Sequence, residues 1–187
     1  MNIGLYFGSF NPVHTGHLII GNTIASESEL HQVWFIISPQ NPLKPQKTLL
    51  NEYHRKHLID ISIEGESKLR SSSIEFNLPK PSFTIDTLSY LHEKHPSYTF
   101  SLIVGSDSYS NLHNWKNFDQ LENYPILIYK RPGFEITLRK INHRIINAPL
   151  LEISSTDIRK MIKEKKSIRY FVPDVVKNEI ERNGYYK

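Results

Sequence analysis

Two histidines near the N-terminus, His14 and His17, lie three residues apart in the segment Gly8–His17 (GSFNPVHTGH). Gly8 follows a short apolar run, and a glycine at a strand end lets backbone approach a ligand closely. Thr15 or Gly16 would open a helix, whose free N–H groups and dipole attract an anion. Both histidines could then donate to one phosphate. Two alternatives stay open: a metal pair, for which no third ligand is nearby, and a capped helix with incidental histidines.

A second polar group stands about 140 residues later in Ile153–Arg159 (ISSTDIR). Ser155 or Thr156 can cap a helix, and Arg159 then lies one turn further on the same face. This arrangement predicts another anion site, suited to β- and γ-phosphates; the alternative is a plain cap beside an exposed arginine. Asp107 follows a further apolar run, where it could accept from a ribose hydroxyl or only form a turn.

Composition limits the kinds of protein that could carry these groups. The chain has 187 residues, which fits one domain, and no cysteine, which excludes disulfide scaffolds, thiolate metal sites and cysteine nucleophiles. Its formal net charge of +4 fits an anionic partner without choosing one. No apolar run approaches the roughly 20 residues that span a bilayer, and the N-terminus lacks the features of a signal peptide. We therefore expect a cytoplasmic protein without a membrane partner.

Apolar runs of strand length alternate with amphipathic stretches along the chain. The expected strands are Ile3–Phe7, Val33–Ile37, Ser73–Leu78, Phe100–Val104, Ile126–Tyr129 and Arg144–Ile146. The expected helices are Thr15 to about Glu29, Glu52–Ile63, Thr84–Lys94, Ser155–Glu164 and Pro173–Arg182. This alternation predicts an α/β fold with a Rossmann-like, doubly wound parallel sheet, in a single domain over 1–187 with a small C-terminal helical part at about 155–187. Ligands of such sheets bind beyond the carboxyl ends of the strands, here after Phe7, Ile37, Val104 and Ile146.

The two motifs together resemble those of the nucleotidylyltransferase superfamily. GSFNPVHTGH resembles its H-x-G-H signature, and ISSTDIR its late I-S-S-T-x-I-R signature, in the same order. The chain is most similar to the bacterial nicotinate-nucleotide adenylyltransferase family, because Pro81–Leu88, Val104–Ser108 followed by Trp115, and Arg131–Gly133 also resemble segments of that family. One departure is Asn11, which stands where the family more often has Asp, so a carboxylate role at this position is in doubt.

The resemblance implies adenylyl transfer from ATP to nicotinate mononucleotide, giving deamido-NAD and pyrophosphate. It assigns catalysis to His14, His17 and Arg159. It assigns ATP binding to Gly8, Ser9, Phe10, His14, His17, Gly105, Asp107, Ser155, Thr156 and Arg159. It assigns mononucleotide binding to Lys44, Thr84, Trp115 and Lys116, with a core position as the alternative for the tryptophan. Lys44 and Arg55 could be electrostatic helpers or solvated surface residues.

The expected cofactor is Mg²⁺, held mainly by ATP phosphates and water because no Asp-x-Asp cluster is present. No protein side chain is therefore assigned to a metal. Rival functions are a phosphopantetheine adenylyltransferase, a cytidylyltransferase, and a nucleic-acid-binding module without catalysis. The first usually has Thr at the position of His14, and no RNA-binding motif supports the last, so nucleic acid is not an expected partner. A homo-oligomer is compatible with the sequence.

Overall fold

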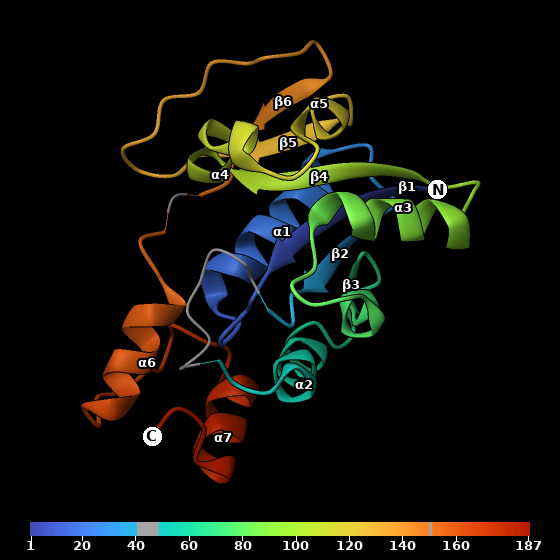
Figure 1. Cartoon of the computed structure of the whole chain (residues 1–187). Helices are drawn as coiled ribbons and strands as arrows, with labels where there is room; N and C mark the ends of the chain where they lie inside the picture. The colour runs from blue at the N-terminus through green and yellow to red at the C-terminus, as the bar shows by residue number, and fades with distance from the viewer. Residues whose placement is uncertain (41–48, 150) are drawn as a thin grey trace.

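A computed structural model describes residues 1–40, 49–149 and 151–187 (Figure 1). Its strands are β1 (Asn2–Gly8), β2 (Gln32–Ile37), β3 (Leu69–Ser72), β4 (Thr99–Gly105), β5 (Ile126–Tyr129) and β6 (His143–Ile146). Its α-helices are α1 (Thr15–Glu27), α2 (Glu52–Ser62), α3 (Thr84–Lys94), α4 (Ser106–Ser110), α5 (Phe118–Leu121), α6 (Ser155–Lys163) and α7 (Asp174–Asn183). Short 3₁₀ helices cover Ile74–Asn77 and Leu112–Asn114.

The strands form one six-stranded sheet in the order β3-β2-β1-β4-β5-β6, and every pairing is parallel. The chain moves outward from β1 to one edge and then returns to place β4 on the other side of β1. This is the doubly wound order that the sequence predicted. The order reverses between β1 and β4, so the carboxyl ends of these two strands flank the usual ligand crevice of such a sheet.

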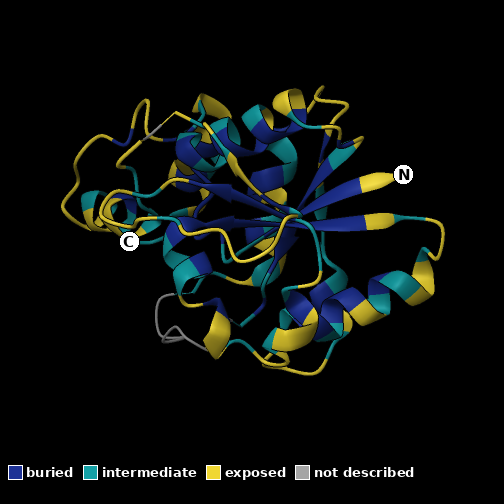
Figure 2. Ribbon diagram, turned by 90° about the horizontal axis from the view of Figure 1, so that it is seen from above, coloured by how far each residue is buried: buried dark blue, intermediate teal, exposed yellow. Residues whose placement is uncertain are grey.

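Helices cover both faces of the sheet because the strands alternate their apolar side chains. Ile3 and Leu5 of β1 belong to the core cluster that packs against α3, α4 and α5, whereas Tyr6 points into the cluster shared with α1, α2, α6 and α7. The period of two in a pleated strand produces this division. Figure 2 shows the buried strands at the centre, with the exposed residues on the outer sides of the helices and loops.

The C-terminal helices share their core with the sheet. Ile158 of α6 and Val176 and Ile180 of α7 lie in the same apolar cluster as Ile24 of α1 and Phe35 of β2. Helix α7 also lies beside α2 (Figure 1). The C-terminal helical part is therefore packed onto the sheet, which allows it to contribute to a site at the strand ends.

One predicted strand is wrong. Ser73–Leu78 alternates apolar and polar residues, but the edge strand is the more polar Leu69–Ser72, and most of the predicted segment is the 3₁₀ helix Ile74–Asn77. The alternation is misleading because the polar residue within it, Glu75, is only 1% exposed. Its carboxylate is buried against hydroxyl donors from later in the chain, Ser82 and Thr87.

Candidate active site

The loop that joins β1 to α1 is shaped by close packing. A methyl group on Gly8 would lie 2.8 Å from the Phe10 ring, so a larger residue would displace that ring. Phe10 has a φ of 44°, in the left-handed region, and its buried ring packs edge-on against His17 with 5.0 Å between centroids. Phe10 therefore supports His17 from the core, and Ser9 lies half-buried beside it.

His14 and His17 meet at the start of α1. Their rings stack with 3.6 Å between centroids, and His14 caps the helix by accepting from the His17 backbone N–H at Nδ1, 3.3 Å away. Burial, and secondly the charge of Arg131, lower the pKa of His14 to about 4. His14 is therefore neutral at pH 7, and because Nδ1 accepts, its proton sits on Nε2. A neutral imidazole of this tautomer is a hydrogen-bond donor.

The late motif converges on this loop, which brings together the two segments that the resemblance assigns to ATP binding. The Ser155 hydroxyl donates to the carbonyl of Pro12 at 2.9 Å, and Arg159 Nη1 donates to the carbonyl of Asn11 at 2.7 Å. Arg159 also donates to the Thr156 hydroxyl, at 3.3 Å. These contacts join residues 143 and 148 positions apart. They bring the starts of α1 and α6 together.

The predicted cap of α6 is wrong by one residue. Ser154, and neither Ser155 nor Thr156, is the N-cap, and its hydroxyl accepts from the Asp157 N–H at 3.1 Å. Ser155 instead uses its hydroxyl on the β1–α1 loop. The helix itself begins at Ser155, as the expected range Ser155–Glu164 has it, so the Ser155 and Thr156 side chains lie in its first turn.

The ends of β4 and β5 add a third group of polar residues. A methyl group on Gly105 would come within 2.4 Å of the Asp107 carboxylate, so glycine lets this carboxylate lie against the strand end. The Ser106 hydroxyl accepts from the Arg131 N–H at 2.8 Å and thereby links the two strand ends. Arg131 stacks over Tyr129, 5.2 Å from the ring centroid, and donates to its hydroxyl at 3.4 Å.

Arg131 is absent from the site residues assigned above, although its charge lowers the pKa of His14 and the nearby Asp107 carboxylate helps to raise the pKa of Arg131. Its Nε is buried and has no hydrogen-bond partner within the described part of the chain. The sequence held a signal for it: Arg131 comes two residues after the buried strand Ile126–Tyr129, whose carboxyl end is not among the ligand-binding strand ends expected above.

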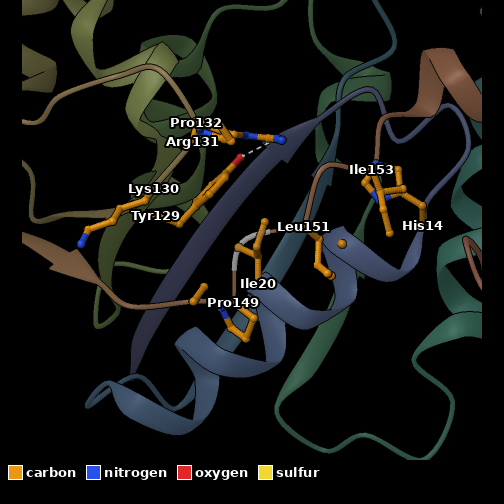
Figure 3. A pocket seen from close by; sticks show the side chains of 11 residues that line it. His14, Ile20, Tyr129, Lys130, Arg131, Pro132, Pro149, Leu151 and Ile153 are labelled. Atoms are coloured by element: carbon orange, nitrogen blue, oxygen red, sulfur yellow. Dashed lines mark hydrogen bonds between the residues drawn. The ribbon is translucent and has the colours of Figure 1, made fainter.

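A pocket lies between the start of α1 and the end of β5 (Figure 3). Arg131 and His14 lie on different walls of it, and α1 forms its floor in the view shown. Its apolar lining comes from Ile20, Tyr129, Pro132, Ala148, Pro149, Leu151 and Ile153. The enclosed space is only about 10 Å³, so the structure shows apolar surface beside cationic and N–H donors rather than an open cavity.

A second group of predicted residues gathers at the start of α3. Thr84 is the first residue of the helix, and the N-cap Phe83 supplies no side-chain cap. Lys116 Nζ bonds both oxygens of Asp86, at 3.0 and 2.9 Å, and lies 4.8 Å from the centroid of the Phe83 ring. Trp115 is partly buried and packs against the core cluster that includes α3. Lys44 falls outside the described residues.

The described residues offer neither a metal cluster nor a membrane-spanning helix. No cluster of three or more His, Asp or Glu side chains in this part of the chain could hold a metal ion. None of its helices combines the length and the apolar character that a bilayer crossing needs.

Comparison with known proteins identifies the class that this fold and site define. Residues 5–161 match the cytidylyltransferase-like family, and the chain belongs to it. A Flavobacterium psychrophilum protein named "Probable nicotinate-nucleotide adenylyltransferase" is 49% identical, with 100% of both chains covered. A Cytophaga hutchinsonii protein of the same name is 48% identical, with 100% of this chain and 98% of that protein covered.

A solved structure agrees with these relatives. Plasmodium falciparum nicotinic acid mononucleotide adenylyltransferase complexed with NaAD has a TM-score of 0.85 and 25% identity to this chain, and the match covers 99% of this chain and 97% of that one. Within the cytidylyltransferase-like family, the chain therefore belongs to the nicotinate-nucleotide adenylyltransferases.

Proposed function

We propose that this protein transfers the adenylyl group of ATP to nicotinate mononucleotide, forming deamido-NAD and pyrophosphate. The observation that carries the proposal is the contact of Arg159 and Ser155 with the β1–α1 loop at the switch point of the sheet. It brings two helix starts, two histidines and an arginine to one place, and each of these favours phosphate.

The reaction needs alignment and charge stabilisation more than proton transfer. The attacking group is a phosphate oxygen of the mononucleotide, which is largely a dianion at neutral pH. It forms a bond to the α-phosphorus of ATP while the bond to the bridging oxygen breaks, and pyrophosphate leaves with that electron pair. A general base is not required. Positioning and electrostatics then supply most of the rate.

The chain's own residues divide this work. His14, a neutral donor fixed by its bond to the His17 N–H, is suited to an α-phosphate oxygen without adding charge. His17 would donate beside it. Arg159, held by the Asn11 carbonyl, and the first turn of α6 would receive the β- and γ-phosphates. Arg131, with its buried Nε, is a further donor for the triphosphate.

The remaining parts of the two substrates fit the rest of the site. The apolar residues that line the pocket of Figure 3 would contact the adenine ring, and Asp107 at the end of β4 would accept from a ribose hydroxyl. Trp115 would lie against the pyridine ring. Backbone N–H groups at the uncapped start of α3, near Thr84, and at Lys116 would donate to the nicotinate carboxylate. The positive charge of Lys44 would assist. A full negative charge accepts stronger hydrogen bonds than a carboxamide oxygen, which favours the acid over the amide.

We also propose Mg²⁺ as the cofactor and the cytoplasm as the location. The donors around His14 are N–H groups and arginines, which suit phosphate oxygens rather than a hard cation. Mg²⁺ would therefore be held mainly by ATP phosphates and water. When bound, the ion neutralises part of the phosphate charge.

The test is pyrophosphate release from ATP and Mg²⁺ with three acceptors offered separately. We expect rapid release with nicotinate mononucleotide, slower release with nicotinamide mononucleotide, and none with phosphopantetheine. Release with phosphopantetheine alone would refute the assigned acceptor but keep the reaction class. No release with any acceptor would refute adenylyl transfer to these substrates.

A further inference from the structure

Two buried ionisable side chains, Arg55 and Glu75, have no part in the chemistry described above. Arg55 of α2 is 0% exposed, and Glu75 of the 3₁₀ helix after β3 is 1% exposed. Side chains of these types are almost never fully buried unless they are paired or extensively hydrogen-bonded. The alternative that Arg55 is a solvated surface residue is therefore wrong, and its partners reveal what it does.

Arg55 bonds four main-chain carbonyls from three separate segments. It donates to Ser9 in the β1–α1 loop, to Ser38 (2.9 Å) and Pro39 (3.4 Å) after β2, and to Leu50 (2.8 Å) before α2. A guanidinium presents its donors in a rigid, planar fork, so one side chain can fix the relative positions of several carbonyls. Arg55 thus holds the loop under the proposed ATP phosphates against the end of β2.

Glu75 holds the start of α3 in place, as Arg55 holds the β1–α1 loop. Its carboxylate accepts from the Ser82 and Thr87 hydroxyls, each at 2.7 Å. Ser82 precedes the helix, and Thr87 lies in its first turn. Two carboxylate oxygens offer several acceptor positions and no donor, which matches hydroxyl donors on more than one side. The start of α3 is therefore tied to the 3₁₀ helix rather than capped by its own residues.

The two arrangements meet at Ser38. Its carbonyl accepts from Arg55, and its side chain lies close enough to Glu75 to offset part of the rise that burial causes in the pKa of that carboxyl, because the end of β2 packs against the 3₁₀ helix. Its N–H also donates to the carbonyl of Gly8 at 3.0 Å. Hydrogen bonds thus join Ser9 to Ser38 through Arg55, and join Ser82 to Thr87 through Glu75. The Ser38 side chain beside Glu75 links the two sets. We call the whole arrangement the Arg55–Ser38–Glu75 network.

We propose that the Arg55–Ser38–Glu75 network is a positioning device that sets the spacing between the β1–α1 loop and the start of α3. This proposal rests on the proposed function, in which the loop holds ATP and the start of α3 holds the mononucleotide. In-line attack requires the reacting atoms about 3–3.5 Å apart, and a misplacement of about 1 Å can cost about 10²-fold in rate. None of the network residues needs to touch a substrate for this effect.

The sharpest variant is Thr87→Val, which keeps the shape of the side chain and removes one donor to Glu75. We expect kcat to fall about 10-fold and the KM for nicotinate mononucleotide to rise several-fold, with the KM for ATP little changed. Thr87→Ser retains the hydroxyl and should restore most of the activity. Ser89→Ala is the matched control, because it removes another α3 hydroxyl that bonds only within the helix, to the Ile85 carbonyl at 3.0 Å.

Arg55→Lys tests the other end of the network. A lysine keeps the positive charge but has one donor group, which cannot span the four carbonyls. We expect kcat to fall about 10²-fold with both KM values raised. Ile59→Val, a buried change one turn further on the same helix, controls for general loosening of α2. Melting temperatures of all variants show which of them are fully folded at the assay temperature.

The double variant Arg55→Lys/Thr87→Val decides whether the two ends act together. If they position the same pair of sites, the loss in kcat/KM will be smaller than the product of the single losses, because the spacing is already released. Multiplicative losses, or a Thr87→Val enzyme with the kinetic constants of Ser89→Ala, would overturn the network. Wild-type enzyme that makes no deamido-NAD would overturn the proposed function instead, which separates the two failures.

Discussion

His14 and His17 stack on each other, but they differ in burial, and this difference gives them different roles. His14 is 4% exposed and neutral, so it serves as a fixed donor and helix cap, whereas His17 is only half-buried. His17 is therefore better placed to meet the charge that develops at the α-phosphate. We expect His17→Ala to lower kcat about 10²–10³-fold, the usual loss for one donor to a developing oxyanion. Steady-state kinetics beside His31→Ala, an exposed imidazole on another surface, would measure it; near-normal turnover would mean that the histidine is structural.

The buried state of His14 also predicts how stability depends on pH. Its pKa is about 4 in the folded protein and near 6.5 when unfolded. Between these values the unfolded chain binds more protons, so this contribution is complete above pH 6.5 and is lost as the pH falls towards 4. We expect the free energy of unfolding of the wild type to fall by roughly 3 kcal/mol more than that of His14→Gln between pH 7 and pH 4. The measurement is a series of denaturant titrations at pH values between 7 and 4. If the free energies of unfolding of the two proteins changed in parallel with pH, the lowered pKa of His14 would be contradicted.

Among the elements, α6 depends on its cap to present Arg159. Ser154 satisfies the Asp157 N–H, and the first turn that it starts carries Ser155 onto the β1–α1 loop. Ser154→Ala should lower the free energy of unfolding by about 1 kcal/mol and raise the KM for ATP. Lys160→Ala, at an exposed position of the same helix, should change stability by no more than about 0.5 kcal/mol. Equal effects from both variants would show that the cap is not what orders this turn.

The elements also show what the sequence could and could not predict. Strands buried on both faces, such as β1, β2 and β4, appear as continuous apolar runs and were predicted correctly. The edge strand β3 is short and polar and has one neighbour, so no run marks it. The 3₁₀ helix that follows β3 depends on tertiary contacts. The hydrogen-bond partners of Glu75 lie at the start of α3, and no local sequence pattern reveals them.

The burial of Arg55 could have been predicted from the spacing of its apolar neighbours. Arg55 precedes Leu58 and Ile59 by three and four residues, and both of these are 0% exposed. Residues at this spacing share one face of a helix, so Arg55 had to face the core. The two motifs predicted site residues, such as His14 and Arg159, but not how these residues lie relative to one another. That arrangement depends on the fold, which brings the two segments into contact.

At the scale of the whole molecule, the sheet separates the helix starts that the proposal gives to different substrates: α1 and α6 lie on one face and α3 on the other. Trp115 belongs to the mononucleotide side. If its ring covers the pyridine, Trp115→Ala loses a stacking contact of roughly 0.5–1.5 kcal/mol beyond its buried area. The KM for nicotinate mononucleotide should rise several-fold while the KM for ATP barely moves, and Trp115→Phe should lose less. Equal losses for both substrates would assign the tryptophan to the core cluster that it also contacts.

The central claim is that this fold joins ATP to the acid form of the pyridine mononucleotide. The most direct test is a competition: purified protein with ATP, Mg²⁺ and equal concentrations of nicotinate and nicotinamide mononucleotide, with both dinucleotide products separated and quantified over time. The account predicts that deamido-NAD predominates and that pyrophosphate forms in equal amount, because backbone donors at the start of α3 favour a full negative charge. Equal amounts of deamido-NAD and NAD, or an excess of NAD, would contradict it.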